Sequence, residues 1–351
     1  MNKNVESLDK LKESTDLQLI KESNELYKKY LNGTITNSFT AINKKTPHTY
    51  EENGQQLLFT PEELGIDTAS LDDIEEKDGE YSHNLSITSS KLLDIIQLSL
   101  TEILPLNATD EELSKYLELN LDVSKYMEFT GKKDKNQAVK QIKEDLETLF
   151  RARTKATIMR KVKRGKTYKK EPIVMDIRYI DAKPAEAIRQ TAPIRLALSY
   201  VKYLSQCSQF MYYPIPILIS CRNNNVYYIG KKLATHYNMN RTKANKDSIS
   251  VDKLLKWTPD IPSLDEEKKR GRHYRDKCIN PLEKSLDELQ RLGVLKEWYF
   301  TNKNKESLSD EQLTQFYTSY DEWKHLYLHF VIKDYPTYQK AIAHNDKKEA
   351  L

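Results

Sequence analysis

The stretch from Lys135 to Ile180 constrains the fold more than any other part of the chain, because its pattern of apolar residues changes half-way along. Up to Arg153 the apolar residues recur at helical spacing, at Ala138, Val139, Ile142, Leu146, Leu149 and Phe150. Two β-prone runs follow, at residues 156–159 and 173–180, and a very basic turn that contains Gly165 joins them. The pattern predicts an amphipathic helix with a defined buried face, followed by a β-hairpin.

The side of this predicted helix that lies opposite the apolar stripe is polar. At about 100° per residue it carries a row of side chains, namely Lys133, Asn136, Lys140, Lys143 and Glu147. Four of the five donate hydrogen bonds, which suits phosphate oxygens and the edges of bases. We therefore expect this row to contact nucleic acid.

Positive charge is concentrated in the predicted hairpin. Seven cations fall within eleven residues: Arg160, Lys161, Lys163, Arg164, Lys166, Lys169 and Lys170. Residues 131–180 hold 16 Lys and Arg against 6 Asp and Glu, a formal charge of +10, whereas residues 1–80 hold 9 against 17, a charge of −8. The net charge of the whole chain, +4, conceals this separation. Lysine-rich faces are often plain solvated surface, but clustering this sharp favours a polyanionic partner.

The residues before this stretch predict the elements that complete a DNA-binding domain. A helix is expected from a cap at Thr88-Ser89-Ser90 to the residue before Pro105, then a capped short helix from Thr109 to Leu117. Strand-like alternation follows at 117–123, and a short helix at 124–129 is closed by Gly131. Short helix, turn, longer helix and hairpin together predict a winged helix, in which the second helix enters the major groove and the hairpin reaches the backbone or the adjacent minor groove.

A second set of elements follows Asp181. We expect a helical stretch through Ile194, Leu196, Ala197, Val201 and Leu204, an apolar connector at 210–219 broken by two prolines, and helices at 226–236, from Ser250, and from Arg270 to Gly293. β-prone residues follow at 294–300 and 326–332. Residues 142–149 and 282–289 share a pattern, which indicates a faint internal repeat. Opposite the apolar stripe of the last helix lie His273, Lys277, Asn280, Lys284, Asp287 and Arg291, with Arg270, Arg272 and Arg275 near its N-terminal end.

These patterns predict a mainly helical α+β protein with small β-hairpin wings. We expect an acidic N-terminal appendage at residues 1–85, partly disordered, with an amphipathic helix over residues 1–30. Two tandem winged-helix DNA-binding domains are expected after it, at residues 86–182 and 183–351, which agrees with a usual domain size of roughly 100 to 200 residues. The appendage is expected to bind a partner or to drive self-association into a dimer.

Other classes of protein find little support in the sequence. No apolar run has the length that spans a bilayer, so we expect no membrane association. The three cysteines, Cys207, Cys221 and Cys278, form no C-x-x-C pair, which favours buried thiols in a reducing cytoplasm over disulfides or zinc ligands. A cytoplasmic location, associated with the nucleoid or a plasmid, is the prediction.

We also expect no enzymatic activity, no cofactor and no metal. Gly131-Lys132 and Gly230-Lys231 lack the other residues of a phosphate-binding loop. His325 and His329 do not form the His-apolar-His pair of rolling-circle nickases. Tyrosines at apolar positions are expected in the core or an interface rather than as nucleophiles, namely Tyr212, Tyr213, Tyr227 and Tyr228.

Several short segments resemble plasmid replication initiators of the tandem winged-helix Rep class, and related initiator-like proteins of mobile elements in low-GC Gram-positive bacteria. They are Lys91-Leu-Leu-Asp, Asp122-Val-Ser-Lys-Tyr-Met-Glu-Phe-Thr-Gly, Gln141-Ile-Lys-Glu-Asp-Leu-Glu-Thr-Leu, Tyr228-Ile-Gly-Lys-Lys-Leu, and Ser250-Val-Asp-Lys-Leu-Leu through Ile261-Pro-Ser. The resemblance covers residues 88–335 at the level of pattern. It implies binding to repeated origin sites through both winged helices, with dimers repressing their own gene and monomers opening the origin. It also implies a host helicase or helicase loader among the partners.

Three functions stay open on the sequence. The first is an origin-binding initiator, which requires specific binding to repeated duplex sites. The second is a transcriptional regulator or partition protein of the same kind of element, which uses the same contacts without melting DNA. The third is a rolling-circle nickase, which requires metal-dependent cleavage and a covalent tyrosine adduct.

Overall fold

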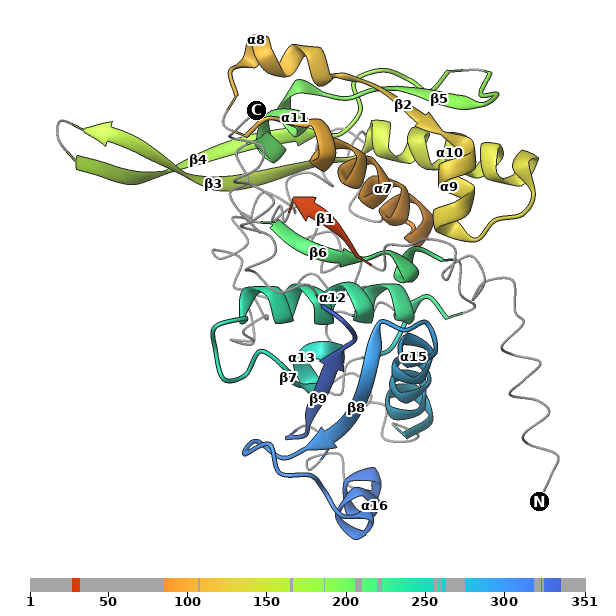
Figure 1. Cartoon of the computed structure of the whole chain (residues 1–351), viewed down its shortest axis with the longest axis vertical. Coiled ribbons are helices and arrows are strands. Elements are labelled where there is room, and N and C mark those ends of the chain that lie inside the picture. Colours follow the sequence, from red (N-terminus) through yellow and green to blue (C-terminus); the bar gives the residue numbers. More distant parts are fainter. Residues whose placement is uncertain are drawn as a thin grey trace. The chain divides into compact units, whose positions relative to one another are not determined.

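The computed structural model describes residues 27–31, 85–106, 108–164, 167–185, 187–205, 210–219, 223–255, 258, 260–262, 275–318, 323 and 325–335; for 29–31, 153–176, 210 and 315–318 it describes the backbone path alone. Within these residues helices are accompanied by small antiparallel sheets (Figure 1), as an α+β fold requires. The chain divides into two compact units. We call Tyr30–Phe210 with Lys256–Asp260 the α10 unit, and Met1–Lys29 with Met211–Leu255 and Ile261–Leu351 the α15 unit.

The α10 unit contains five helices, a short 3-10 helix and four strands among its described residues. In chain order these are α7 (Ile87–Ile103), α8 (Asp110–Leu113), η1 (Ser114–Tyr116), β2 (Glu118–Asp122), α9 (Val123–Thr130), α10 (Lys135–Arg151), β3 (Arg153–Arg164), β4 (Thr167–Arg178), β5 (Thr191–Arg195) and α11 (Leu198–Ser205). α10 packs against α7 and α9, and α11 packs against α8 and β4. The predicted boundary between residues 182 and 183 falls inside this unit, because β5 and α11 return to it.

The cap of α7 lies earlier than the sequence predicted. Ser86, rather than Thr88-Ser89-Ser90, is the N-cap, and its hydroxyl accepts a hydrogen bond from the backbone N of Ser89. Ser89 and Ser90 are buried within the first turn. α7 ends before Pro105 as predicted, because proline cannot continue a helix.

Three local signals produce the short-helix, turn and long-helix segment that the sequence predicted. Asp122 caps α9 by accepting hydrogen bonds from the backbone N of Ser124 and Lys125. Gly131 ends α9 in the left-handed region, with φ of 67°, where glycine is unstrained. Asp134 caps α10. The predicted capping pattern at Thr109 is also confirmed, since Thr109 and Glu112 form a capping box that begins α8.

The predicted hairpin is confirmed as a ladder of twelve residue pairs between β3 and β4, from Arg153 opposite Arg178 to Arg164 opposite Thr167. In Figure 1 it extends away from the helices of its unit. β2 pairs with β5 instead of joining this ladder. The helical prediction for Ile194 and Leu196 was wrong: Ile194 lies on β5 and Leu196 forms a bridge with Ile180, and the helix begins at Leu198.

The α15 unit is built around one buried helix. Its elements, including two strands at its division from the other unit, are β1 (Tyr27–Leu31), β6 (Phe210–Pro214), η2 (Ile215–Leu218), α12 (Asn225–Met239), β7 (Ser248–Ser250), α13 (Val251–Leu255), the π-helical turn η3 (Arg275–Ile279), α15 (Asn280–Arg291), β8 (Leu295–Thr301), α16 (Asp310–Thr318) and β9 (Tyr327–Ile332). β7, β9 and β8 form a three-stranded antiparallel sheet in that order. The long helix predicted from Arg270 to Gly293 is helical from Arg275 to Arg291, where the π-helical turn η3 runs directly into α15, while residues 270–274 lie outside the described residues.

The predicted apolar character of several side chains in this unit is confirmed. Tyr213, Tyr227 and Tyr228 are buried, as is Cys278, whereas Tyr212 is half-buried. Cys207 and Cys221 lie outside the described residues. α12 approaches α15 closely at Gly230, where an added Cβ would lie 2.7 Å from Cγ2 of Ile217 and 2.8 Å from Cδ2 of Leu289. Glycine at this position therefore allows the two helices to pack in contact.

The predicted helix over residues 1–30 was wrong at its end. Tyr27–Leu31 is strand β1, which pairs with β6, while residues 1–26 lie outside the described residues. Tyr27 donates a hydrogen bond from its hydroxyl to the carbonyl oxygen of Lys333 at 2.5 Å, and its ring contacts that of Tyr335 edge-on. Part of the predicted appendage is thus held in a folded unit.

Neither a membrane-spanning helix nor a group of metal-binding residues is found in the described part of the chain. Of the helices it contains, none combines the length and the apolar character that crossing a bilayer requires. Nor do its His, Cys, Asp and Glu residues form any group of three or more that fits a metal ion.

Candidate nucleic-acid interface

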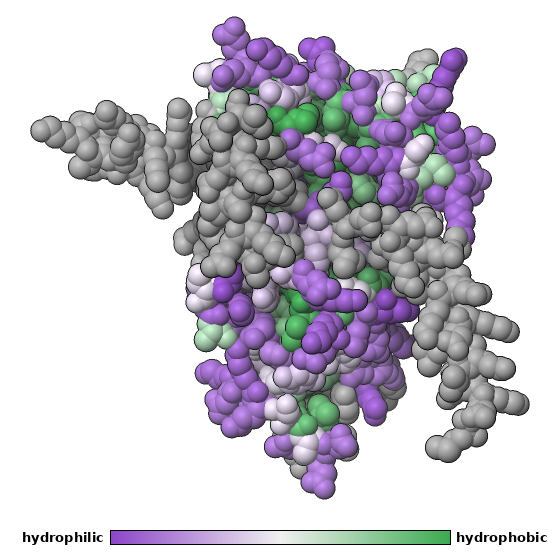
Figure 2. Space-filling model, viewed as in Figure 1, coloured by the Kyte–Doolittle hydropathy of each residue, from purple (hydrophilic) through white to green (hydrophobic). Residues whose placement is uncertain are grey.

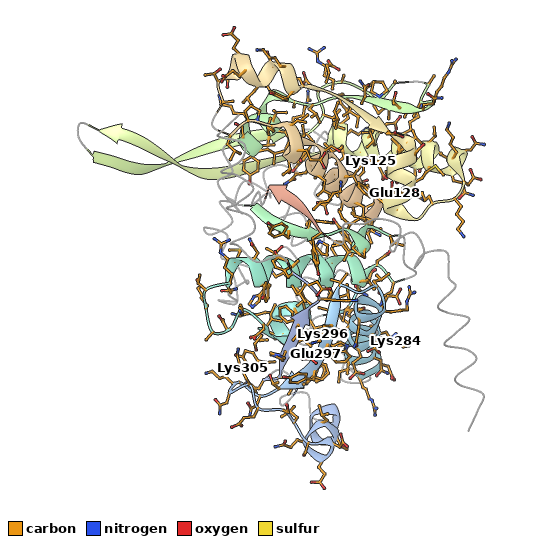
Figure 3. The ribbon with its side chains drawn as sticks, in the orientation of Figure 1. Lys125, Glu128, Lys284, Lys296, Glu297 and Lys305 are labelled. Carbon is orange, nitrogen blue, oxygen red and sulfur yellow. The ribbon has the colours of Figure 1, made fainter. Side chains whose placement is uncertain are left out.

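The N-terminal half of α10 presents a polar, exposed surface. One side of the helix is apolar, with Ala138, Ile142, Leu146 and Leu149 buried against α7 and α9, so the other side has to face outward. The end of the unit that carries α9 and α10 is drawn largely in the hydrophilic colour in Figure 2. Figure 3 labels Lys125 and Glu128 on α9, next to this surface.

The structure places the five residues predicted from the helical wheel on or beside α10. Asn136, Lys140 and Glu147 are exposed on the helix, and Lys143 is half-buried. Lys133 is exposed in the turn before the helix. Lys140 is 79% exposed and its Nζ lies 3.9 Å from the carboxylate of Glu144. A surface ion pair at that separation holds a lysine weakly, so Lys140 is available to a phosphate or a base.

Sequence reasoning missed two exposed residues of the first turn, Lys135 and Gln137. The helical wheel assigned neither to its polar row, because it ranked positions by angle alone. Position along the helix is a second signal, because in known recognition helices the N-terminal residues contact the base edges. The cap at Asp134 already marked where that first turn begins.

The buried side of α10 holds one carboxylate. Asp145, 2% exposed, faces the N-terminus of α7. Its Oδ1 accepts hydrogen bonds from the hydroxyls of Thr88 and Ser89, both at 2.8 Å, and from Nε2 of Gln141 at 3.3 Å. Burial raises the pKa of Asp145, and these hydrogen bonds oppose the rise.

The hairpin carries its cations at known positions in the ladder. Lys161 pairs with Lys170, and Lys163 with Tyr168. Arg160, Arg164 and Lys169 occupy other rungs near the tip, while Lys166 lies outside the described residues. Because β3 begins two residues after α10 ends, the basic ladder and the exposed face of α10 belong to one unit.

The corresponding hairpin of the α15 unit has the opposite charge. Residues 153–178 contain ten Lys and Arg against two acidic residues, a formal charge of +8. Residues 295–332, which span β8 to β9, contain four Lys against six acidic residues, a charge of −2. Lys305 of this hairpin is also engaged, because its Nζ lies 2.7 Å from Oδ1 of Asp247. The formal charges therefore favour an anionic partner at the β3–β4 hairpin over the β8–β9 hairpin.

The predicted polar face of the second long helix is less basic than its sequence pattern suggested. Lys277 and Lys284 are exposed, Lys277 on the π-helical turn η3 and Lys284 on α15 (Figure 3). Asn280 donates a hydrogen bond to Oδ1 of Asp276 at 3.0 Å, and Arg291 donates two to the carboxylate of Glu288 at 2.7 and 2.6 Å. Asp287 is exposed. Arg272 and His273 lie outside the described residues.

Each unit contains an internal hydrogen bond at an equivalent place. In the α15 unit, Ser285 is buried on α15 and accepts a hydrogen bond from Nδ2 of Asn223 at 2.7 Å. Asn223 in turn accepts one from the backbone N of Asn225, the first residue of α12. Asp145 and Ser285 occupy equivalent places in the internal repeat, since each lies three residues after an aligned buried residue, Ile142 or Leu282. Each long helix is thus tied to the start of the long helix that precedes it in its unit.

The chain was compared with known families and proteins. No family model and no curated protein matches it.

Proposed function

We propose that the chain is a sequence-specific, double-stranded DNA-binding replication initiator of a plasmid or other mobile element. Binding to origin repeats would help to open the origin or to load host replication proteins. The observation that carries the DNA-binding part is the continuous order of α9, the Gly131 turn, α10 and the +8 hairpin β3–β4 in one unit. The initiator role rests on the resemblance to the Rep class.

We assign a winged helix to each unit. In the α10 unit the assignment takes α7, β2, α9, α10 and the β3–β4 hairpin; in the α15 unit it takes α12, β7, α13, α15 and the β8–β9 hairpin. The four-residue turn between α9 and α10, with glycine at its start, supports the helix-turn-helix of the first. The sheet order β7, β9, β8 supports the second, because the strand before the helices pairs beside the hairpin.

We infer different DNA contacts for α10, for the β3–β4 hairpin and for the hairpin of the α15 unit from their charges. α10 enters the major groove and contacts base edges through its N-terminal residues, among them Asn136 and Lys140, while the β3–β4 hairpin contacts phosphates. Phosphate contacts hold the protein in register without reading sequence. Seven such contacts would give a slope of log affinity against log salt of about −6. The hairpin of the α15 unit, with its charge of −2, takes little part in this.

The first test is a footprint on the DNA that flanks the gene of this protein, followed by affinity measurements on the protected repeat and on random duplex DNA. We expect the repeat to bind at least about 10³-fold more tightly at physiological salt. Lys140→Ala with Lys143→Ala should remove most of this preference. The matched control is Lys115→Ala with Lys303→Ala, two exposed lysines of other elements, which should retain it. Equal affinity of the unaltered protein for repeat and random DNA would refute the proposal.

A second test separates the initiator from the other functions. A reporter plasmid that carries the protected repeats should replicate only when the protein is supplied. Specific binding without replication would favour a regulator or partition protein. Supercoiled origin DNA should stay intact with magnesium or manganese, and nicking with a covalent protein adduct would favour the nickase.

A further inference from the structure

We propose that Asp145 is a positioning residue, which fixes the rotation of α10 about its axis and thereby the register of its exposed residues on the base edges. This inference rests on the proposed function. It concerns a residue that contacts no DNA and that lies on the buried side of the helix. Its support comes from the geometry of the α7–α10 junction and from the parallel contact in the other unit.

Asp145 joins α10 to one defined point of α7. The Oδ1 atom of Asp145 accepts hydrogen bonds from the hydroxyls of two residues in the first turn of α7, Thr88 and Ser89, at 2.8 Å each. The hydroxyl of Ser86, the N-cap, lies 3.5 Å away. Gln141, one turn earlier on α10, donates to the same oxygen and to Oγ1 of Thr88. Apolar side chains can slide past one another, but this set of directional bonds is satisfied in one rotation of α10 only.

The charge of Asp145 suits its place. A carboxylate next to the N-terminus of a helix interacts favourably with the unpaired N–H groups and the positive end of the helix dipole. α7 has no acidic residue in its own first turn, so the carboxylate from α10 takes that position. The other oxygen, Oδ2, is buried and has no hydrogen-bond partner among the described residues. Burial of an oxygen without a hydrogen bond lowers the stability of the folded protein. This favours a role for Asp145 in orienting α10 rather than in stabilising the fold.

A rotation of α10 about its axis displaces the exposed side chains that are proposed to face DNA. Asp145 and Asn136 are nine residues apart, which places them about 180° apart around the helix. With a helix radius of about 5 to 6 Å including side chains, a rotation of about 20° moves an exposed tip by about 2 Å. A shift of that size breaks a hydrogen bond to a base. Hydrogen bonds to phosphate tolerate it better, because long lysine side chains on the hairpin adjust.

The α15 unit repeats the arrangement with a neutral group. Ser285 replaces Asp145, and the side chain of Asn223 replaces the hydroxyls of α7. The same place in two repeats is thus occupied by a buried polar residue that binds the start of the preceding long helix. In the α10 unit, which carries the basic hairpin, the buried polar residue is the carboxylate Asp145 instead of a neutral serine.

The test measures the ratio of affinities for the protected repeat and for random DNA in two variants of Asp145. Asp145→Ala should lower the ratio at least about tenfold, the value of one good base contact, and leave the affinity for random DNA and its salt slope unchanged. Asp145→Asn keeps an acceptor at Oδ1 and should restore most of the ratio. Thr148→Ala is the matched control, because its hydroxyl donates a hydrogen bond within α10, to the carbonyl oxygen of Glu144, and it should keep the full ratio.

Two outcomes would overturn the inference: a ratio for Asp145→Ala equal to that of Thr148→Ala, or an equal loss in the Asn and Ala variants. Amide hydrogen exchange without DNA gives an independent readout, since Asp145→Ala should speed exchange in the first turn of α7. This readout holds even if the unaltered protein shows no preference for repeats, in which case the proposed function fails and the α7–α10 junction is still tested. If Asp145→Ala does not fold, Thr88→Val with Ser89→Ala removes two donors and must reproduce the lowered ratio.

Discussion

His236 makes the stability of the folded chain depend on pH. It is buried in α12, and its Nε2 lies 3.0 Å from the carbonyl oxygen of Asn245. Burial lowers the pKa of His236 from 6.5 to about 4, and the nearby cation of Lys232 works in the same direction. In the unfolded chain its pKa is about 6.5. The folded protein therefore holds this imidazole neutral at a pH where the unfolded chain protonates it.

The consequence is a loss of stability in acid. A depressed folded pKa gives stability that is present above the unfolded pKa and is lost as pH falls from about 6.5 towards 4. The free energy of unfolding should drop by about 3 kcal/mol between pH 7 and pH 4 from this residue. The variant His236→Gln should lose less unfolding free energy over the same pH range. Chemical denaturation at several pH values gives this free energy for the unaltered protein and for the variant. The difference between the two pH profiles isolates the imidazole from groups such as Asp145 that act in the opposite direction. Parallel profiles for the two proteins would contradict the prediction.

The sequence predicted which side chains of α10 are exposed, but it did not predict the hydrogen bonds of the buried polar side chain on this helix. Lys140 and Asn136 were placed on the exposed face because a helical wheel needs only spacing. Asp145 was not singled out, although it lies about 20° from buried Ala138 on the wheel. Its role depends on hydroxyls that lie 56 and 57 positions earlier in the chain, and local spacing contains no information on them.

At the scale of elements, the contact of α12 with its neighbours depends on Gly230. Gly230→Ala gains helix propensity of about 1 kcal/mol but places a methyl group within 3 Å of side-chain atoms of Ile217 and Leu289. Overpacking usually costs about 1 to 3 kcal/mol, so we expect a net loss in unfolding free energy of about 1 kcal/mol. Chemical denaturation measures it.

A second substitution identifies the clash. Leu289→Val removes the atom that lies 2.8 Å from the added Cβ. The double variant should lose less stability than the sum of the two single variants, which is the sign of a direct contact. Additive losses would show that Gly230 matters for another reason.

Elements with local signals were predicted and elements that depend on distant partners were not. α9 and α10 begin at side-chain caps, and α10 has apolar residues at helical spacing. The β3–β4 hairpin needs only a turn between its strands. β1 and β5 pair with strands far away in the chain, at β6 and β2. Strand propensity is weak when the partner is unknown, so both were assigned to helices.

At the scale of the whole molecule, charge distinguishes the two units more clearly than fold does. The prediction is a difference in salt dependence. Lys161→Gln with Lys163→Gln, in the β3–β4 hairpin, should reduce the slope of log affinity against log salt by about 2, because each phosphate contact contributes about 0.9. Lys296→Gln with Lys303→Gln, in the β8–β9 hairpin, should leave the slope unchanged. Binding titrations on the same duplex at four salt concentrations measure both, and equal changes would contradict the assignment of phosphate contacts to one hairpin.

The length of the β3–β4 ladder sets a scale for the duplex. Twelve residues in extended conformation measure about 40 Å, and one turn of B-DNA measures about 34 Å. If α10 contacts base pairs as proposed, an arm of this reach could touch phosphates a full helical turn away from them. One unit would then cover a longer stretch of DNA than a single helix can read, and the spacing between repeats would have to leave room for the arm.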